Sequence, residues 1–282
     1  MSDFSGKTFS TMSKRRDRGC IFCGKPSGSR EHALPTWLAE SMGRKNDPLL
    51  PTLFTSAGSW ETNGNPRSAG NVVTKRVCHG CNTGWMSDLE GMVKPILEPW
   101  LKTQSSKLTR DFLRLPHGSL QMVNRWLLKT ACCLREVAPR GQLEKLPGNA
   151  CRWAFENALP PTCKTYAAWI RESSCGFRIS RGFATLNGGI LYKRQQHPES
   201  FDVLFHLNHL AMRIVNAPDA DFSLMPIYNS QVKHCTPNFW SIDSQPPESD
   251  EDSCVFDDTA SFVDVFVVRP LPPSAPVPES AV

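Results

Sequence analysis

The chain has 282 residues, of which 40% are hydrophobic and 21% are charged, so it can bury the core of one large domain or of two modest ones. This composition excludes wholesale disorder. No apolar run approaches the ~20 residues that a membrane span requires, and residues 1–19 contain no apolar stretch typical of a secretory signal. We therefore expect a cytoplasmic protein that is not inserted in a membrane.

The net charge of +5 is distributed unevenly. Residues 1–110 contain 16 Lys and Arg against 9 Asp and Glu, whereas residues 111–282 contain 16 against 18. The basic first part favours a polyanionic partner, and nucleic acid is the usual one. A solvated surface that binds no partner could have the same composition.

The predicted organisation begins with a basic flexible arm at 1–17 and a cysteine-rich module at 18–104. Within the module, Pro35 and Gly43 bracket a short predicted helix, because proline suits a first helical turn and glycine suits a helix end. The Gly-, Ser- and Asn-rich residues 55–71 predict a loop, and residues 72–77 predict a strand. A helix is expected after Cys81, with an interruption at Pro95 or Pro99.

The second part is predicted as an α+β domain at 105–242. Apolar spacing predicts helices at 119–137 and 151–159, followed by strand-like runs that include "TYAAWIR", "GFRISRGFATL", "FDVLFHL" and "LAMRIV". Residues 243–282 are expected to form an acidic and Pro-rich loop, one strand at 262–269 and a flexible tail. No motif here indicates a chemistry, so substrate selection, a protein partner and homodimer formation all stay open as roles of this domain.

Four of the eleven cysteines form two C-x2-C pairs, Cys20/Cys23 and Cys78/Cys81. This paired spacing is typical of a closed tetrahedral zinc site, which stabilises a small module and performs no hydrolysis. Two coincidental pairs of reduced thiols are the alternative. The other seven cysteines show no pairing and are interpreted as buried thiols.

The adjacent Glu31 and His32 in "SREHALPTW" are the candidates for catalysis. Hydrolysis of a phosphodiester needs a general base and a divalent cation, and neutral imidazole can act as the base near pH 7. Carboxylate and amide oxygens suit Mg²⁺ or Mn²⁺, and Asn82, directly after Cys81, offers an amide oxygen. If zinc draws the two cysteine pairs together, Glu31, His32 and Asn82 can converge.

The combined pattern "CIFCG…SREHALPTWL…NVVTKRVCHGCNTGWMSDLE" resembles the HNH endonucleases of the zinc-stapled ββα-metal type found in bacteria and phages. The resemblance covers about residues 18–100. It implies that His32 is the general base and that Glu31 and Asn82 bind the catalytic cation. It also implies that Cys20, Cys23, Cys78 and Cys81 hold a structural zinc.

The sequence departs from this family in two places. The central asparagine of the motif corresponds only weakly to Asn71, seven residues before Cys78, where it would hold the loop that presents His32. The last position is Asn82, where many members have histidine. Two further polar residues, His79 and Glu90, are interpreted as solvent-facing side chains.

The second part also contains a "W-x-x-K-x-A" helix pattern at Trp126, Lys129 and Ala131, which resembles a helix that recurs in uncharacterised bacterial HNH proteins. This likeness implies no role. The leading hypothesis is a metal-dependent endonuclease that hydrolyses DNA, with Zn²⁺ as structural metal and Mg²⁺ or Mn²⁺ as catalytic metal. The alternative is a non-catalytic, zinc-ribbon-like module that binds nucleic acid.

Overall fold

The structure is a computed structural model, and it describes residues 19–49, 52–54, 60–62, 67–102, 115–137, 146–180, 184–187, 190–193, 198–216, 218, 220–221, 255–256 and 269–270. The predicted arm at 1–17 lies outside the described residues. So does the predicted strand at 262–269, apart from Arg269. The described chain contains both helices and strands, and its fold class is α+β, as predicted.

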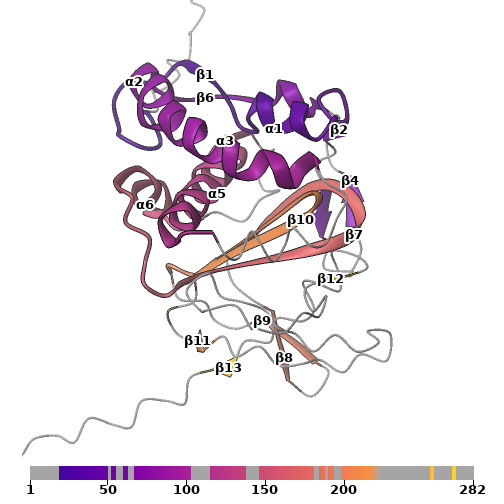
Figure 1. The fold of residues 1–282 in the computed structure, drawn as a ribbon. Coiled ribbons are helices and arrows are strands. Elements are labelled where there is room, and N and C mark those ends of the chain that lie inside the picture. The colour runs from indigo at the N-terminus through magenta and orange to yellow at the C-terminus, as the bar shows by residue number, and fades with distance from the viewer. Residues whose placement is uncertain are drawn as a thin grey trace, which may run out of the picture.

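The first part is built on a two-stranded antiparallel sheet that leads directly into a helix (Figure 1). Strand β1 (Ser29–His32) pairs with β6 (Val73–Val77), and His32 lies opposite Val73. After β6 and Cys78 come three helical segments: α2 (His79–Cys81), η2 (Asn82–Met86) and α3 (Ser87–Lys102). The chain kinks within η2 at Gly84, whose backbone angles are not helical. The strand predicted at 72–77 is confirmed.

Helix α1 (Thr36–Ser41) confirms the short helix predicted between Pro35 and Gly43. Gly43 has φ +70°, a conformation that glycine adopts without strain, and its N–H binds the carbonyl of Glu40 as the helix ends. The loop predicted at 55–71 is wrong in part, because it contains two short strands, which pair with two others at 48–54, and a 3₁₀ turn. These elements are β2 (Pro48–Leu49) with β5 (Arg67–Ser68), β3 (Thr52–Phe54) with β4 (Trp60–Thr62), and η1 (Ala69–Asn71).

Helix α3 continues through both of its prolines, so the predicted interruption at Pro95 or Pro99 is wrong. Both prolines are on the exposed side, where a missing N–H costs less. The opposite side buries an apolar stripe of Leu89, Val93, Leu97, Trp100 and Leu101. Burial of that stripe outweighs the ~3 kcal/mol that proline typically costs inside a helix.

Helices α5 (His117–Val137) and α6 (Ala150–Glu156) confirm the two helices predicted in the second part. Helix α5 packs against α3, α6, β6 and β10 (Phe201–Asn216), which makes it the central helix of the molecule (Figure 1). One continuous cluster of buried apolar residues extends from Cys20 to Ile214. The core therefore runs across the domain boundary predicted at residue 104.

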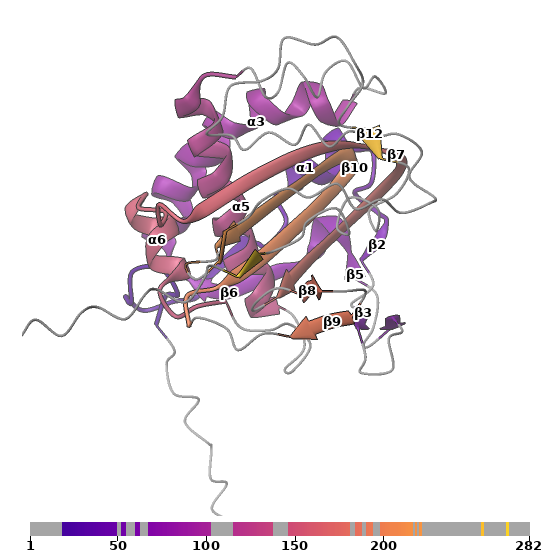
Figure 2. The same ribbon diagram turned by 90° about the horizontal axis from the view of Figure 1, so that it is seen from below.

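The largest sheet consists of β7 (Cys163–Ser180) and β10 in antiparallel pairing, with the short β12 (Val255–Phe256) parallel to β7. Figure 2 shows the two long strands side by side. Two further pairs are β8 (Ala184–Asn187) with β9 (Ile190–Lys193) and β11 (Ala220–Asp221) with β13 (Arg269–Pro270).

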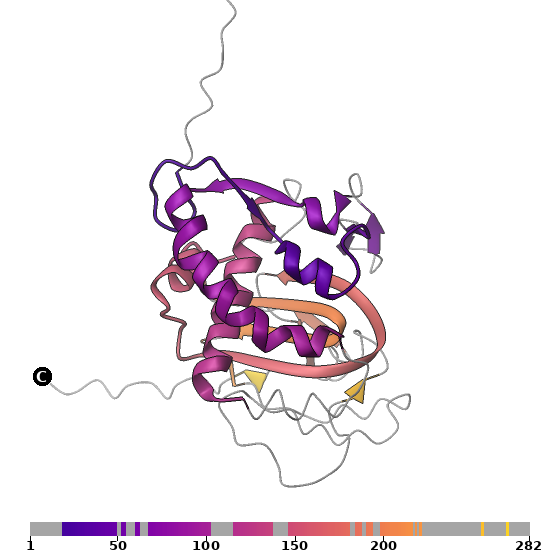
Figure 3. The ribbon, with the colours of Figure 1, turned by 45° about the horizontal axis from the view of Figure 1, so that its top comes forward.

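Strand β10 is sharply bent. The guanidinium of Arg213 makes two hydrogen bonds, of 2.8 and 2.7 Å, to the Asp202 carboxylate on the same strand. Eleven extended residues would span ~36 Å, so the two arms of β10 must fold back on each other. The bend lies at Asn208, which has φ +56°, and Figure 3 shows β10 curved inside β7. The two arms match the strand-like runs "FDVLFHL" and "LAMRIV", which the sequence separates at the same place.

The Asn208 side chain also joins the bend to the helices. Its amide N–H donates to the carbonyl of Leu101 at 2.8 Å, and its oxygen accepts from Arg44 Nε at 3.0 Å. The C-terminal turn of α3 is thus fixed against β10.

No helix among the described residues is long and apolar enough to cross a membrane.

Candidate metal centre and the carboxylates beside it

The first cysteine pair lies in a tight loop before β1. The Cys20 N–H binds the carbonyl of Lys25 at 2.7 Å, and Gly24 closes the turn with φ +75°. Gly19 is required by close approach, because a Cβ there would lie 2.3 Å from the Gly24 carbonyl oxygen. The N–H of Ile21 binds the Arg76 carbonyl at 2.9 Å, so the loop is fastened to β6.

The second cysteine pair forms the start of α2. Cys78 is the residue that caps this helix, and its sulfur accepts a hydrogen bond from the Cys81 N–H at 3.3 Å. Aromatic packing also joins the two pairs, because the Phe22 ring meets the Trp85 ring edge-on at 5.1 Å. The chain therefore brings both pairs together by its own hydrogen bonds and packing.

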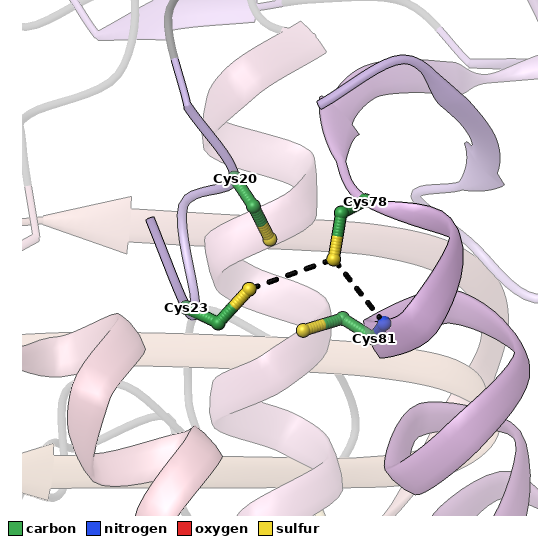
Figure 4. A group of neighbouring side chains, drawn as sticks. All are labelled: Cys20, Cys23, Cys78 and Cys81. Carbon is green, nitrogen blue, oxygen red and sulfur yellow. Dashed lines mark hydrogen bonds between the residues drawn. The ribbon is translucent and has the colours of Figure 1, made fainter. Parts of the chain in front are cut away.

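All four sulfur atoms of the two pairs lie within 4.8 Å of one another, and Figure 4 shows them directed toward a common centre. Cys23 Sγ and Cys78 Sγ are 3.5 Å apart. In a tetrahedral zinc site with bonds of ~2.3 Å, the sulfurs lie ~3.8 Å apart. The four thiols can therefore hold a metal ion such as zinc, and the predicted ligand set of Cys20, Cys23, Cys78 and Cys81 is brought together.

Local hydrogen bonds favour the thiolate form of Cys78. Burial raises the pKa of this thiol, but the Cys81 backbone N–H and the neighbouring thiols lower the pKa to about 7. Thiolate is the form of cysteine that binds metal. Near pH 7 about half of the Cys78 thiol is therefore ionised, which reduces the proton release that zinc binding requires from this ligand.

Asn82, the residue after the last cysteine, lies against β1. Its Nδ2 donates to Ser29 Oγ at 2.7 Å and to the Arg30 carbonyl at 3.3 Å. Both acceptors are within three residues of His32. Asn82 thus contacts the first two residues of β1, and its convergence with the side chains of Glu31 and His32 stays a prediction.

Glu31 is nearly buried, and its carboxylate is paired with a lysine from α5. Lys129 Nζ lies 2.8 Å from Glu31 Oε1, and the same ammonium also donates a hydrogen bond to Glu90 Oε1 on α3. The Lys129 side chain is 0% exposed, against 10% for Glu31 and 22% for Glu90. We call this group of two carboxylates and one ammonium the Glu31–Lys129–Glu90 cluster.

The cluster keeps its lysine charged. Burial lowers the pKa of Lys129, but the negative groups around it, including Glu90 and Glu31, outweigh burial and raise the pKa above its ordinary value. Burial raises the pKa of the Glu31 carboxyl, and the nearby Lys129 and His32 charges oppose that rise. With both carboxylates ionised, the cluster has a net charge of −1.

His32 and Asn71 lie at the ends of the paired strands. His32 is half-buried and is the last residue of β1, whereas Asn71 is exposed and lies two residues before Val73, the partner of His32 in the sheet. Ala33, the residue after His32, donates its backbone N–H to the Val72 carbonyl at 2.8 Å. Asn71 therefore lies in the loop beside the His32 segment, and its role stays a prediction.

Beside the cysteine cluster, Glu31 and Asn82 offer oxygen donors. Lys129 contacts Oε1 of Glu31, and Oε2 is the second oxygen of that carboxylate. Asn82 contacts β1 through Nδ2, and Oδ1 is the oxygen of the same amide. Oxygen donors with net negative charge suit Mg²⁺ or Mn²⁺. Glu90, which contacts the same lysine as Glu31, is a further carboxylate.

Sequence reasoning missed Lys129 and assigned Glu90 to a solvent-facing position. The signal for Lys129 was present, because a lysine in the middle of the apolar helix run "WLLKTACCL" is unusual unless a carboxylate pairs with it. Comparisons with known proteins add no assignment: no family model, no curated protein and no solved structure matches the chain.

Proposed function

We propose that this protein is a metal-dependent endonuclease of the HNH type that hydrolyses DNA phosphodiester bonds. The observation that carries the proposal is the contact of Asn82 with Ser29 and Arg30. It joins the residue that follows the fourth thiol to the strand that bears Glu31 and His32. Two antiparallel strands followed by a helix, with one cysteine pair before β1 and the other after β6 at the same end of the sheet, are the arrangement that the resemblance implies.

In this proposal each metal has its own role. Zinc bound by the four thiolates is structural, because four protein ligands leave no open position for water. A separate Mg²⁺ or Mn²⁺, held by Glu31 and Asn82, supplies charge stabilisation at the phosphate and at the leaving oxygen when it is bound.

The residues of the chain supply the proton transfer and the binding. His32 accepts a proton from the water that attacks phosphorus, as a neutral imidazole does near pH 7. Asn82 keeps β1 against the helix, which fixes the backbone on which His32 lies. Exposed basic side chains of the same sheet, Arg30 and Lys75, attract the phosphate backbone. The products are a 5′-phosphate and a 3′-hydroxyl.

The ion pair of Glu31 favours the alternative function. A carboxylate that is nearly buried and bound to Lys129 can serve the fold alone. The protein would then be a zinc-containing module that binds nucleic acid and does not cleave it.

Plasmid cleavage separates the two functions. Zinc-loaded protein is incubated with supercoiled plasmid in Mg²⁺, in Mn²⁺ and in EDTA, beside the His32→Ala variant. The endonuclease nicks or linearises DNA only with a divalent cation, and the variant does not. Retarded migration of intact plasmid under every condition supports the binding module and contradicts the endonuclease.

A further inference from the structure

The Glu31–Lys129–Glu90 cluster joins two parts of the sequence that the motif alone does not connect. Lys129 is on α5, whereas Glu31 is on β1 and Glu90 is on α3. The neighbours of Lys129 on α5, among them Leu128, are 0% exposed. The backbone that carries the ammonium is therefore fixed by the core.

A lysine in this place is not explained by packing. Methionine fills a similar volume without the desolvation of an ammonium group. Replacing a buried ion pair by apolar residues is often neutral or stabilising, so stability alone does not account for the charge. The role of the Lys129 charge therefore depends on the group that it contacts, which is the carboxylate of Glu31, the residue before His32.

The backbone of Glu31 does not fix that carboxylate by itself. Strand β1 has four residues, and its pairing with β6 is irregular between Ser29 and Glu31. Such an irregularity redirects side chains and leaves the local ladder incomplete. The Glu31 carboxylate does, however, contact the fully buried Lys129 ammonium at 2.8 Å.

We propose that Lys129 is a positioning residue of the nuclease site: its ammonium holds the Glu31 carboxylate beside His32 and against Glu90, and it limits the affinity of the site for a divalent cation. The inference rests on the proposed function. Lys129 touches neither water nor DNA in this scheme. It acts through Glu31, and Glu90 is its second anchor.

The test compares Lys129→Met with Arg213→Met in the full-length, zinc-loaded protein. Arg213 is a matched control, because it is in another buried ion pair, with Asp202 on β10, outside the proposed site. Each variant loses one buried cation: Lys129→Met removes the ammonium that contacts Glu31 and Glu90, and Arg213→Met removes the guanidinium that contacts Asp202. Cleavage and Mn²⁺ binding are measured below the unfolding temperature of each variant, and zinc content is checked in both.

Lys129→Met is expected to lower kcat about tenfold or more and to bind Mn²⁺ about tenfold or more tightly, because a positive charge close to the cation is removed. Arg213→Met is expected to keep the kcat and Mn²⁺ affinity of the wild type. Damaged folding alone would weaken Mn²⁺ binding, so tighter binding with slower cleavage distinguishes positioning from stability. Equal kcat in the two variants, or unchanged Mn²⁺ affinity in Lys129→Met, overturns the inference.

A second variant covers the case in which Lys129→Met does not fold. In Lys129→Met with Glu90→Gln, one of the two facing carboxylates is neutral, so their repulsion is relieved. This double variant is expected to reach the thermal stability of Arg213→Met. Its cleavage rate is expected to stay at least about tenfold below that of the wild type. Wild-type cleavage in the folded double variant overturns the inference. A wild-type protein that cleaves no plasmid overturns the proposed function and the inference together. If the wild type cleaves plasmid, the proposed function holds and the Lys129 variants test the inference alone.

Discussion

The Asn82 side-chain amide lies 2.7 Å from Ser29 Oγ and 3.3 Å from the Arg30 carbonyl oxygen. It joins two segments that are separated by more than fifty residues in the sequence. Because Asn82 follows Cys81 directly, this contact joins the cysteine cluster to the start of the Glu31-His32 segment.

Asn82→Ala removes both hydrogen bonds of the amide. We expect the free energy of unfolding to fall by about 1–2 kcal/mol, which is typical for hydrogen bonds that are partly solvated. Urea unfolding of the zinc-loaded protein measures it. Thr83→Ala is the control, because Thr83 is exposed and binds only within its own helix, to the His79 carbonyl. An equal loss in both variants would contradict the bridging role of Asn82.

Removal of one thiol should open the metal centre. In Cys78→Ser we expect zinc content to fall from about one ion per chain to well below half, and the first part of the chain to unfold, because the binding of structural zinc contributes ~10 kcal/mol or more in small zinc modules. Elemental analysis and thermal unfolding measure both effects. Cys163→Ser, a half-buried thiol outside the cluster, should keep its zinc. Zinc-free wild-type protein that is fully folded would exclude a structural zinc.

His32→Ala tests chemistry separately from folding. Cleavage should fall by about 10²-fold or more, which is what a general base commonly contributes, while zinc content, unfolding temperature and DNA affinity stay close to wild type. His79→Ala is the matched control, because His79 is exposed within the second cysteine pair. If both variants cleave at similar rates, His32 is not the base.

Arg30→Gln tests the basic surface of β1. We expect DNA binding by the full chain to weaken steeply as salt rises. In the variant, the logarithmic slope should decrease by about one unit, because one phosphate fewer is neutralised by the protein. Arg152→Gln is the control, because Arg152 is exposed on α6 and pairs with Glu156. Fluorescence anisotropy from low to moderate salt gives both slopes. An unchanged slope in Arg30→Gln removes Arg30 from the DNA interface.

The parts of the fold that the sequence predicted are those governed by local rules. Helices α1, α5 and α6, strand β6 and the two arms of β10 follow from apolar spacing and from Pro, Gly and Asn at their ends. The prolines of α3 were misjudged because helix continuity there depends on burial against other elements. The paired strands at 48–68 also depend on partners that local periodicity does not reveal.

The candidate site divides in the same way. The cysteine spacing predicted the sulfur cluster, and the contact of Asn82 with Ser29 joins the residue after the last cysteine to the strand that contains Glu31. Lys129 could not be placed, because its contact with Glu31 spans 98 residues of sequence. A buried lysine within an apolar helix indicates that an acidic partner exists, but the partner is identified only when the helix is packed.

The central position of α5 has a consequence for the protein during its synthesis. The ribosome completes both cysteine pairs, β1 and α3 well before it reaches Lys129. In a nascent chain of that length, the Glu31 and Glu90 carboxylates have no Lys129 ammonium between them. An incomplete chain that stops before α5 thus contains every residue of the HNH-like motif and lacks the cation that holds two of its acids in place.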